Sequence, residues 1–494
     1  MSGESSIKIG KKAFLFSALI ILLLMIVSGI LTIVLPAGSF DRTTENGRTL
    51  VVPGSYQEIP KPDYPPWRWF TAPVEILAGP DNITPIVLII FILAVGGSIA
   101  ILEGAGVMEN LVNFLVVRFK KRKYLLIGLM ILFFMSVSSF VGIYEGMVPM
   151  IIFIIPIAIS LGWDTMTGLG ISLLPLAFGF SSAVTNPFSI AVAQRIADLP
   201  LFSGAWLRLI FFLVIYTLVT VFVIRHAKKV EADPSKSLSY KEDEALRLKF
   251  RGVLPAGESG TISRGNRRAL IWFVSCIALA MLIVIVTARM PGLSDLAFPV
   301  LTLLFLTGGI GGGLFADGRA DSGRGKSAKA KQSARSFFRG MVNIFPGIVL
   351  VLMAYSVKHI ITTGMIMDTL LYEAAELIRR SPPLAAGFLI YAVTLVMNFF
   401  IGSASAKAFL MMPILTPLAD LVGITRQTAV LAFDFGDGFS NMIFPTNALL
   451  LIALSFSVAG YPKWMAWTWK LQAAILVITS AFLAFAVAIR FGPF

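Results

Sequence analysis

The sequence predicts an all-α polytopic membrane protein with two inverted repeats, each holding a two-armed hairpin and a broken helix. Long apolar runs and short motifs that recur at one fixed offset carry this prediction. Of the 494 residues, 57% are hydrophobic and 14% are charged, and the mean hydropathy is +0.84. A soluble chain could not keep so much apolar surface from water. Runs such as 13–35 and 83–102 have the length of about 20 residues that crosses a bilayer core.

Clusters of Lys and Arg set the expected orientation. They lie at the N-terminus and at 118–123, 225–268 and 319–339. Basic residues that flank spans stay in the cytoplasm, so the N-terminus is expected inside and the Pro- and Trp-rich segment 37–81 outside. Nine full spans of the inner membrane then place the C-terminus on the extracytoplasmic side. The net charge of +14 reflects this topology, and no nucleic-acid partner is expected.

The expected segments follow from these runs. They are a tail and first span (1–36), an extracytoplasmic loop (37–81), a first repeat (82–225), a cytoplasmic basic linker (226–267), two connecting spans with a basic loop (268–342), and a second repeat (343–490). The first repeat has an amphipathic helix at 105–120, a hairpin at 123–162 and a broken helix at 167–199. The second has the corresponding elements at 365–380, 383–420 and 426–459. Each hairpin either crosses the membrane fully with both arms or re-enters it, and in both cases the chain emerges on the side from which it entered.

Internal similarity at an offset of 261 residues supports the repeats. The NITP motif at 82–85 matches NIFP at 343–346, since 343−82=261. Pro156 and Gly162 match Pro417 and Gly423, and the Thr-Asn pair at 185–186 matches the pair at 446–447. An extra span at 297–316 makes the second copy enter from the opposite side. Inverted repeats of this kind build transporter folds and allow alternating access.

Each long helix is predicted to break where Pro follows Ser, Thr and Asn. The sequences are FSSAVTNP at 180–187 and GDGFSNMIFPTN at 436–447. Pro removes a backbone donor, and Asn186 is expected to cap a new half-helix that starts at Pro187. Half-helix ends attract ions and charged groups. The alternative is a pair of proline kinks that only shape packing.

Polar tips and intramembrane charges complete the candidate site. The first tip contains Glu145, and the second contains Ser403 and Ser405. Asp434 and Asp437 share a helix face, and Asp437, between two glycines, is expected where the helix opens and frees carbonyls for an ion. There it either takes up a proton or, as an anion, holds Na+ or a substrate ammonium. Two alternatives stay open: the serines could serve helix packing, and Glu145 could pair with Lys407.

The strings TNPFSIAVAQRIADLPLFSG (185–204), KAFLMMPILTPLADLVGITRQTAVLAF (407–433) and GDGFSNMIFPT (436–446) resemble the YfcC-type family of basic amino acid antiporters. This family is grouped with the anaerobic C4-dicarboxylate carriers in the ion transporter superfamily. The resemblance implies a scaffold and a transport domain that work as an elevator. The implied site consists of Glu145, Ser182, Thr185, Asn186, Ser403, Ser405, Asp437, Asn441, Thr446 and Asn447.

The expected function is therefore secondary transport of a small charged metabolite, an amino acid or a carboxylate, by ion coupling (Na+ or H+) or exchange. A C4-dicarboxylate carrier is the nearest alternative, and a channel or a membrane-embedded enzyme is more remote. No GxSxG, HExxH or Walker A motif occurs, so no enzyme is expected. One cysteine and two distant histidines predict no metal centre and no cofactor. The expected partners are substrate and lipid bilayer, and a homodimer is an open alternative.

Overall fold

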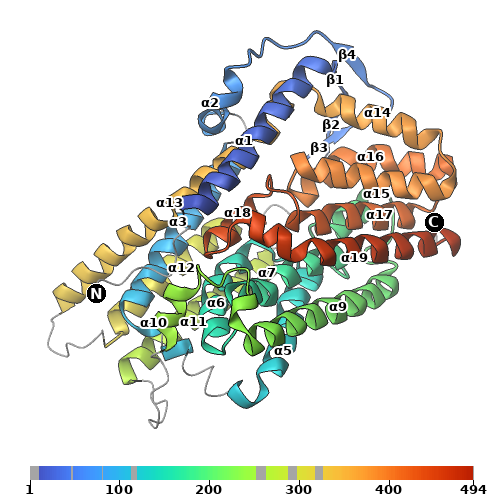
Figure 1. The fold of residues 1–494 in the computed structure, drawn as a ribbon. Coiled ribbons are helices and arrows are strands. Elements are labelled where there is room, and N and C mark those ends of the chain that lie inside the picture. The colour runs from blue at the N-terminus through green and yellow to red at the C-terminus, as the bar shows by residue number, and fades with distance from the viewer. Residues whose placement is uncertain are drawn as a thin grey trace.

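The computed structural model describes residues 11–45, 48–79, 82–108, 110–112, 119–251, 263–287, 297–317 and 326–492. Within these residues, ten helices are long and apolar enough to cross a membrane by length and composition. The predicted all-α membrane fold is confirmed (Figure 1). Most of the amphipathic helix expected at 105–120 lies outside the described residues.

Five long helices form one bundle, here called the long-helix bundle. Its members pack on one another and are α1 (Lys11–Val34), α3 (Ile83–Gly104), α11 (Arg264–Thr287), α12 (Ala297–Phe315) and α13 (Lys326–Thr363). Small residues allow its close contacts: a Cβ on Gly340 of α13 would lie 2.4 Å from the carbonyl oxygen of Gly96 of α3. Small residues at membrane helix interfaces let backbones approach in this way. α13 begins within the segment predicted as a basic loop.

The remaining long elements form a second group, here called the hairpin unit. The first hairpin contains η1 (Lys120–Arg122), α5 (Lys123–Ser136), η2 (Val137–Val141), η3 (Glu145–Met150) and α6 (Ile151–Ser160). The first broken helix is α7 (Thr165–Ser182) and α8 (Ile190–Ile196), followed by α9 (Ala205–Ala232). The second hairpin is α15 (Pro383–Phe400) and α16 (Ala404–Val422). The second broken helix is α17 (Arg426–Gly438), η6 (Phe439–Met442) and α18 (Ala448–Ser455), followed by α19 (Tyr461–Ala488).

Helix starts recur at the offset seen in the sequence. α7 starts at Thr165 and α17 at Arg426, and 426−165=261. The preceding residues are both side-chain caps: Asp164 Oδ1 accepts from the Thr167 N–H at 2.8 Å, and Thr425 Oγ1 accepts from the Thr428 N–H at 3.2 Å. Gly162 and Gly423 have positive φ angles of +89° and +79°, which favour glycine. The two repeats therefore share backbone geometry as well as sequence.

The segment predicted only as an extracytoplasmic loop contains regular structure. β1 (Ala37–Ser39) pairs with β4 (Gln57–Ile59), and β2 (Arg42–Glu45) pairs with β3 (Arg48–Val51), both antiparallel. α2 (Arg68–Glu75) follows. This segment rests on α14 (Met367–Arg379), the second predicted amphipathic helix. Arg42 binds Asp368 through two hydrogen bonds of 2.8 and 2.9 Å, so two segments expected on the outer side share one face.

The basic linker contacts the opposite face (Figure 1). It contains η4 (Pro234–Lys236) and α10 (Glu244–Arg251). His226 Nε2 and the Ser237 hydroxyl bind Asp164 Oδ2 at 2.9 and 2.7 Å. Burial favours the neutral acid, but hydrogen bonds led by that of His226 leave the pKa of Asp164 below its ordinary value. The linker thus anchors to the start of the first broken helix.

Candidate functional site

The first hairpin tip holds the first break in place. The Thr185 hydroxyl donates to the Phe140 carbonyl at 2.9 Å, and the Val184 N–H donates to the Ser139 hydroxyl at 3.2 Å. Gly142 has φ +75°, and a Cβ there would lie 2.4 Å from Asn186 Oδ1. Only glycine fits this position, because both its backbone angle and its close approach exclude a side chain. The hairpin therefore ends against the broken helix.

Asn186 caps the turn that leads into α8. Its Oδ1 accepts from the N–H groups of Phe188 and Ser189 at 2.8 and 3.3 Å. The predicted helix start at Pro187 is wrong: regular helix begins at Ile190, and its N-cap residue is Ser189, which makes no side-chain cap. Residues 187–189 form a turn instead. The side chain is fully buried, and its Nδ2 has no hydrogen-bond partner among the described residues.

Arg208 fills the carbonyl end of α7. It is fully buried near the start of α9. Its guanidinium donates to the Ala183 and Val184 carbonyls at 3.0 and 3.3 Å. It also donates to the carbonyls of Ser203 at 3.0 Å and Phe202 at 3.4 Å. An unwound segment in a membrane protein needs such partners for its backbone. Sequence reasoning missed Arg208, although a charge just inside an apolar span is itself a signal.

Amide side chains surround the second break. Asn447 Oδ1 caps α18 by accepting from Leu449 N–H at 2.9 Å and Leu450 N–H at 3.2 Å. Its Nδ2 donates to Asn441 Oδ1 at 2.7 Å. Asn398, at the end of the first arm of the second hairpin, donates to the same oxygen at 3.0 Å and to the Asp437 carbonyl at 2.8 Å. Asn398 was also missed, and it ties the hairpin to the break.

Lys407 and Asp437 form a buried ion pair at this break. Their side chains are 0% and 1% exposed, and the Lys407 ammonium also contacts Asn398 Oδ1. The alternative that Lys407 pairs with Glu145 falls on a side chain that lies outside the described residues. Asp437 does not lie at an opening in the helix, because α17 runs to Gly438 and the 3-10 turn η6 continues it. The chain leaves helical geometry only after Met442.

Asp434 lies one helical turn before Asp437 on α17 and is also buried. It interacts with Asp437 on the same helix, with Arg208 at longer range, and with the hydroxyl of Ser189. Its oxygens accept no hydrogen bond of normal geometry from the described residues. The carboxylate is thus left without a tethered cation in direct contact.

The two breaks meet each other. A Cβ on Gly438 would lie 1.9 Å from the Ser181 hydroxyl oxygen, so α17 crosses α7 at close range. The Ser405 hydroxyl, from the second hairpin, donates to the carbonyl of Phe188 at 2.8 Å. Groups from both hairpins and both broken helices therefore converge on one buried polar region, here called the break site.

The other predicted residues lie around this region with different contacts. Ser182 donates to the Phe178 carbonyl of its own helix at 2.7 Å. Ser403 is exposed and caps α16. The Thr446 hydroxyl is buried without a partner among the described residues. The structure brings Asn186, Ser405, Asp434, Asp437, Asn441 and Asn447 into the break site and leaves Ser403 at its edge.

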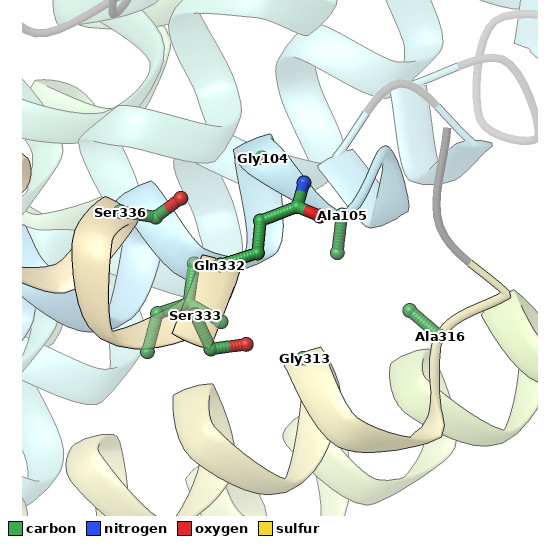
Figure 2. Close-up of a pocket in the computed structure, with 8 residues that line it drawn as sticks. Gly104, Ala105, Gly313, Ala316, Gln332, Ser333 and Ser336 are labelled. Atoms are coloured by element: carbon green, nitrogen blue, oxygen red, sulfur yellow. The ribbon is translucent and has the colours of Figure 1, made fainter. Parts of the chain in front are cut away.

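A hollow that Figure 2 shows lies elsewhere. It is lined by residues at the ends of α3 and α12 and near the start of α13, among them Gly104, Gly313 and Gln332. No residue of the break site lines it. It therefore adds nothing to the candidate site.

The fold and the buried break site define a membrane transport protein. Residues 15–488 match the family model DcuC, described as C4-dicarboxylate anaerobic carrier, and the chain belongs to this family. It is 28% identical over 474 residues to the "Putative basic amino acid antiporter YfcC" of Escherichia coli (strain K12), covering 90% of this chain and 91% of that one. An uncharacterized protein of Haemophilus influenzae is 24% identical over 446 residues, covering 90% of this chain and 82% of that one.

Two solved structures are similar at 17% identity. One is the Alcanivorax borkumensis YdaH transporter, with a TM-score of 0.41 over 97% of this chain and 99% of that one. The other is Neisseria gonorrhoeae MtrF, described among antimetabolite efflux pumps, with a TM-score of 0.43 over 97% and 95%.

Proposed function

We propose that this protein is a secondary active transporter that moves a small charged metabolite across the inner membrane by alternating access. The observation that carries the proposal is the convergence of two repeat-related breaks and two hairpins on buried charges. Intramembrane charges are costly and mark transport pathways, and repeats around a central site are how such carriers are built. The substrate site comprises Asn186, Asn441, Asn447 and the hairpin tips.

The crossing pattern supports inverted repeats. In the proposed topology, five elements cross between the starts of the two repeats: α3, the broken helix α7–α8, α9, α11 and α12. The first hairpin does not change this parity, whether it re-enters or crosses twice. Five is an odd number, so the repeats enter from opposite faces. With the basic linker on the cytoplasmic side, the N-terminus is cytoplasmic and the C-terminus extracytoplasmic. The long-helix bundle then serves as scaffold and the hairpin unit as the moving domain.

Two substrate classes fit the relatives. The family description is that of a dicarboxylate carrier, and one relative is named as a basic amino acid antiporter. Both classes carry a carboxylate, which the free Nδ2 of Asn186 can bind. The amino acid antiporter name belongs to a relative that is 28% identical to this chain and covers 90% of it. An amino acid is therefore our first candidate and a C4-dicarboxylate the second.

Counterflow in proteoliposomes tests this proposal. Vesicles are loaded with unlabelled arginine, lysine, ornithine, succinate or fumarate, and uptake of the labelled compound is followed. We expect saturable, transient accumulation with one amino acid. Counterflow only with a dicarboxylate would select the second class. Linear, non-saturable flux would indicate a channel and contradict the proposal. Thr217→Ala, on an exposed face of α9, is the matched control.

A further inference from the structure

The carbonyl end of a broken helix is a natural place for a cation. Half-helix C-termini carry partial negative charge, and unwound carbonyls coordinate coupling ions in transporters. At the second break, the carbonyls of Met442 and Ile443 accept hydrogen bonds from Trp464 Nε1 at 2.9 Å and from the Tyr461 hydroxyl at 2.6 Å. The Asp437 carboxylate, earlier in the same helix, already has a cation. The Lys407 ammonium contacts the Asp437 carboxylate and Asn398 Oδ1, while Asn398 Nδ2 binds the Asp437 carbonyl at 2.8 Å. A tethered cation thus neutralises the buried carboxylate.

At the first break, too, a buried basic side chain occupies negative groups, but it comes from a different element. Arg208 donates to the carbonyls of Ala183 and Val184, the two residues that follow α7. Arg208 comes from α9 and Lys407 from a hairpin, so symmetry does not relate the two cations. Each satisfies negative groups that would otherwise be open to a small ion. Because both side chains are fully buried, water does not compete with these contacts.

Among the described side chains of the break site, Asp434 is the carboxylate that has no cation in direct contact. The Ser189 hydroxyl and Arg208 at longer range are the groups outside its own helix that interact with it. Among the described residues, no group of three or more His, Cys, Asp or Glu side chains forms a metal-binding cluster. A buried carboxylate without donors is costly to keep charged. A proton neutralises it without needing further ligands or space.

We propose that Lys407 takes the place of a coupling cation at the second break, so that transport runs without Na+, and that Asp434 is the group that carries the coupling proton. The inference rests on the proposed transport function. The carboxylate of Asp434 takes a proton from one side of the membrane and returns it to the other, with no other bond changed. Asp437, the ion-coupling residue expected from the sequence, then has a fixed partner and does not exchange ions.

Thermal unfolding in detergent tests the first half without any substrate. A ligand that binds the native state raises its unfolding temperature. The wild type should unfold at the same temperature in sodium chloride and in choline chloride of equal concentration. Lys407→Gln leaves Asp437 without its cation and should unfold at a lower temperature. The double variant Lys407→Gln/Asp437→Asn, which is again neutral, should recover most of the loss. A Na+-dependent rise in the wild type would overturn the proposal.

Proteoliposome assays test the second half. Counterflow by the wild type should be unchanged when choline replaces Na+, and an imposed pH gradient should drive accumulation. Asp434→Asn should keep counterflow and lose the pH-driven accumulation. Undiminished pH-driven accumulation by this variant, or wild-type counterflow that requires Na+, would overturn the proposal. Absence of wild-type counterflow with every compound would instead reject the transport function, while the unfolding experiment would still report on Lys407.

Discussion

Arg208 is fully buried, and four backbone carbonyls accept hydrogen bonds from its guanidinium. The planar guanidinium of Arg208 donates to all four carbonyls at once, whereas a lysine ammonium is a point charge and cannot. We therefore expect Arg208→Lys to lower the free energy of unfolding by about 2–4 kcal/mol, since hydrogen bonds to charged groups are worth about 1.5–3 kcal/mol each. Denaturant unfolding in detergent measures this. Exposed Arg195 provides the control Arg195→Lys, and equal stability of both variants would contradict the role of Arg208.

The two capping asparagines, Asn186 and Asn447, differ in the hydrogen bonding of their Nδ2 atoms. Asn447 uses its Nδ2 to bind Asn441, whereas the Nδ2 of Asn186 has no partner among the described residues. Asn186→Asp keeps the capping oxygen and removes the amide donor. We expect it to fold normally and to raise KM in counterflow at least about tenfold, the size of one lost hydrogen bond to a charged group. Wild-type KM in this variant would show that Asn186 only caps the turn.

At the scale of residues, the sequence predicted side-chain caps better than it predicted contacts between distant residues. The capping oxygen of Asn186 was predictable because capping depends on residues two or three positions away. The Lys407–Asp437 pair joins a hairpin to a helix, and local patterns carry no information about such contacts. The partners of Arg208 are backbone carbonyls, which every residue has, so nothing in the sequence singles them out.

At the scale of elements, the crossing of α7 and α17 depends on Gly438. A Cβ there would lie 1.9 Å from Ser181 Oγ and 2.5 Å from Ser181 Cα. Gly438→Ala must push the two broken helices apart, and overpacking typically costs about 1–3 kcal/mol. We expect lower stability in detergent and loss of counterflow. Gly402 is the matched control, because a Cβ there meets nothing within 4 Å. If Gly438→Ala behaves like Gly402→Ala, the helices do not need this contact.

The linker carries a pH-dependent anchor. Asp243 accepts from the Thr165 N–H at 3.0 Å and the Ser239 hydroxyl at 2.7 Å, and burial raises its pKa from 3.8 to about 6. A raised pKa means that the folded state holds the proton more tightly. The contribution of Asp243 to the stability of the folded state is therefore complete below about pH 4 and is lost as pH rises through about 6.

The variant Asp243→Asn cannot titrate at this position. We therefore expect the unfolding temperature of the wild type to fall more between pH 4 and pH 7 than that of Asp243→Asn, both measured in detergent. Parallel curves for the two proteins would exclude Asp243 as the titrating anchor.

Helix starts were easier to predict than interruptions. The second broken helix was expected at 426 and begins at Arg426, because a turn with Gly423 and a Thr cap precedes it. The π-helical turn η2, the 3-10 turn η6 and the small sheets of the outer segment were not predicted. They arise from tertiary contacts with the breaks and with α14, which override local preference.

At the scale of the whole molecule, the predicted faces agree with the contacts. Segments expected outside meet one another, as Arg42 and Asp368 do, and segments expected inside meet as well, as Lys463 and Glu242 do. Hydropathy and charge fix which loops share a side, so this level was predictable. The division into a long-helix bundle and a hairpin unit comes from packing, which the sequence does not reveal.

The central claim is that the break site opens to each side of the membrane in turn. Ser405, whose hydroxyl bridges to the carbonyl of Phe188, reports on it. Cys276 is the only cysteine, so Cys276→Ala gives a background in which Ser405→Cys is the single thiol. Glu58→Cys, exposed on β4, is the control and should react from one side only.

The decisive measurement is the labelling of Ser405→Cys by an impermeant maleimide in right-side-out and in inverted vesicles, with and without transported substrate. We predict labelling from both sides, with substrate shifting the ratio between them while Glu58→Cys stays constant. Labelling from one side only, whatever the substrate, would contradict alternating access at this site.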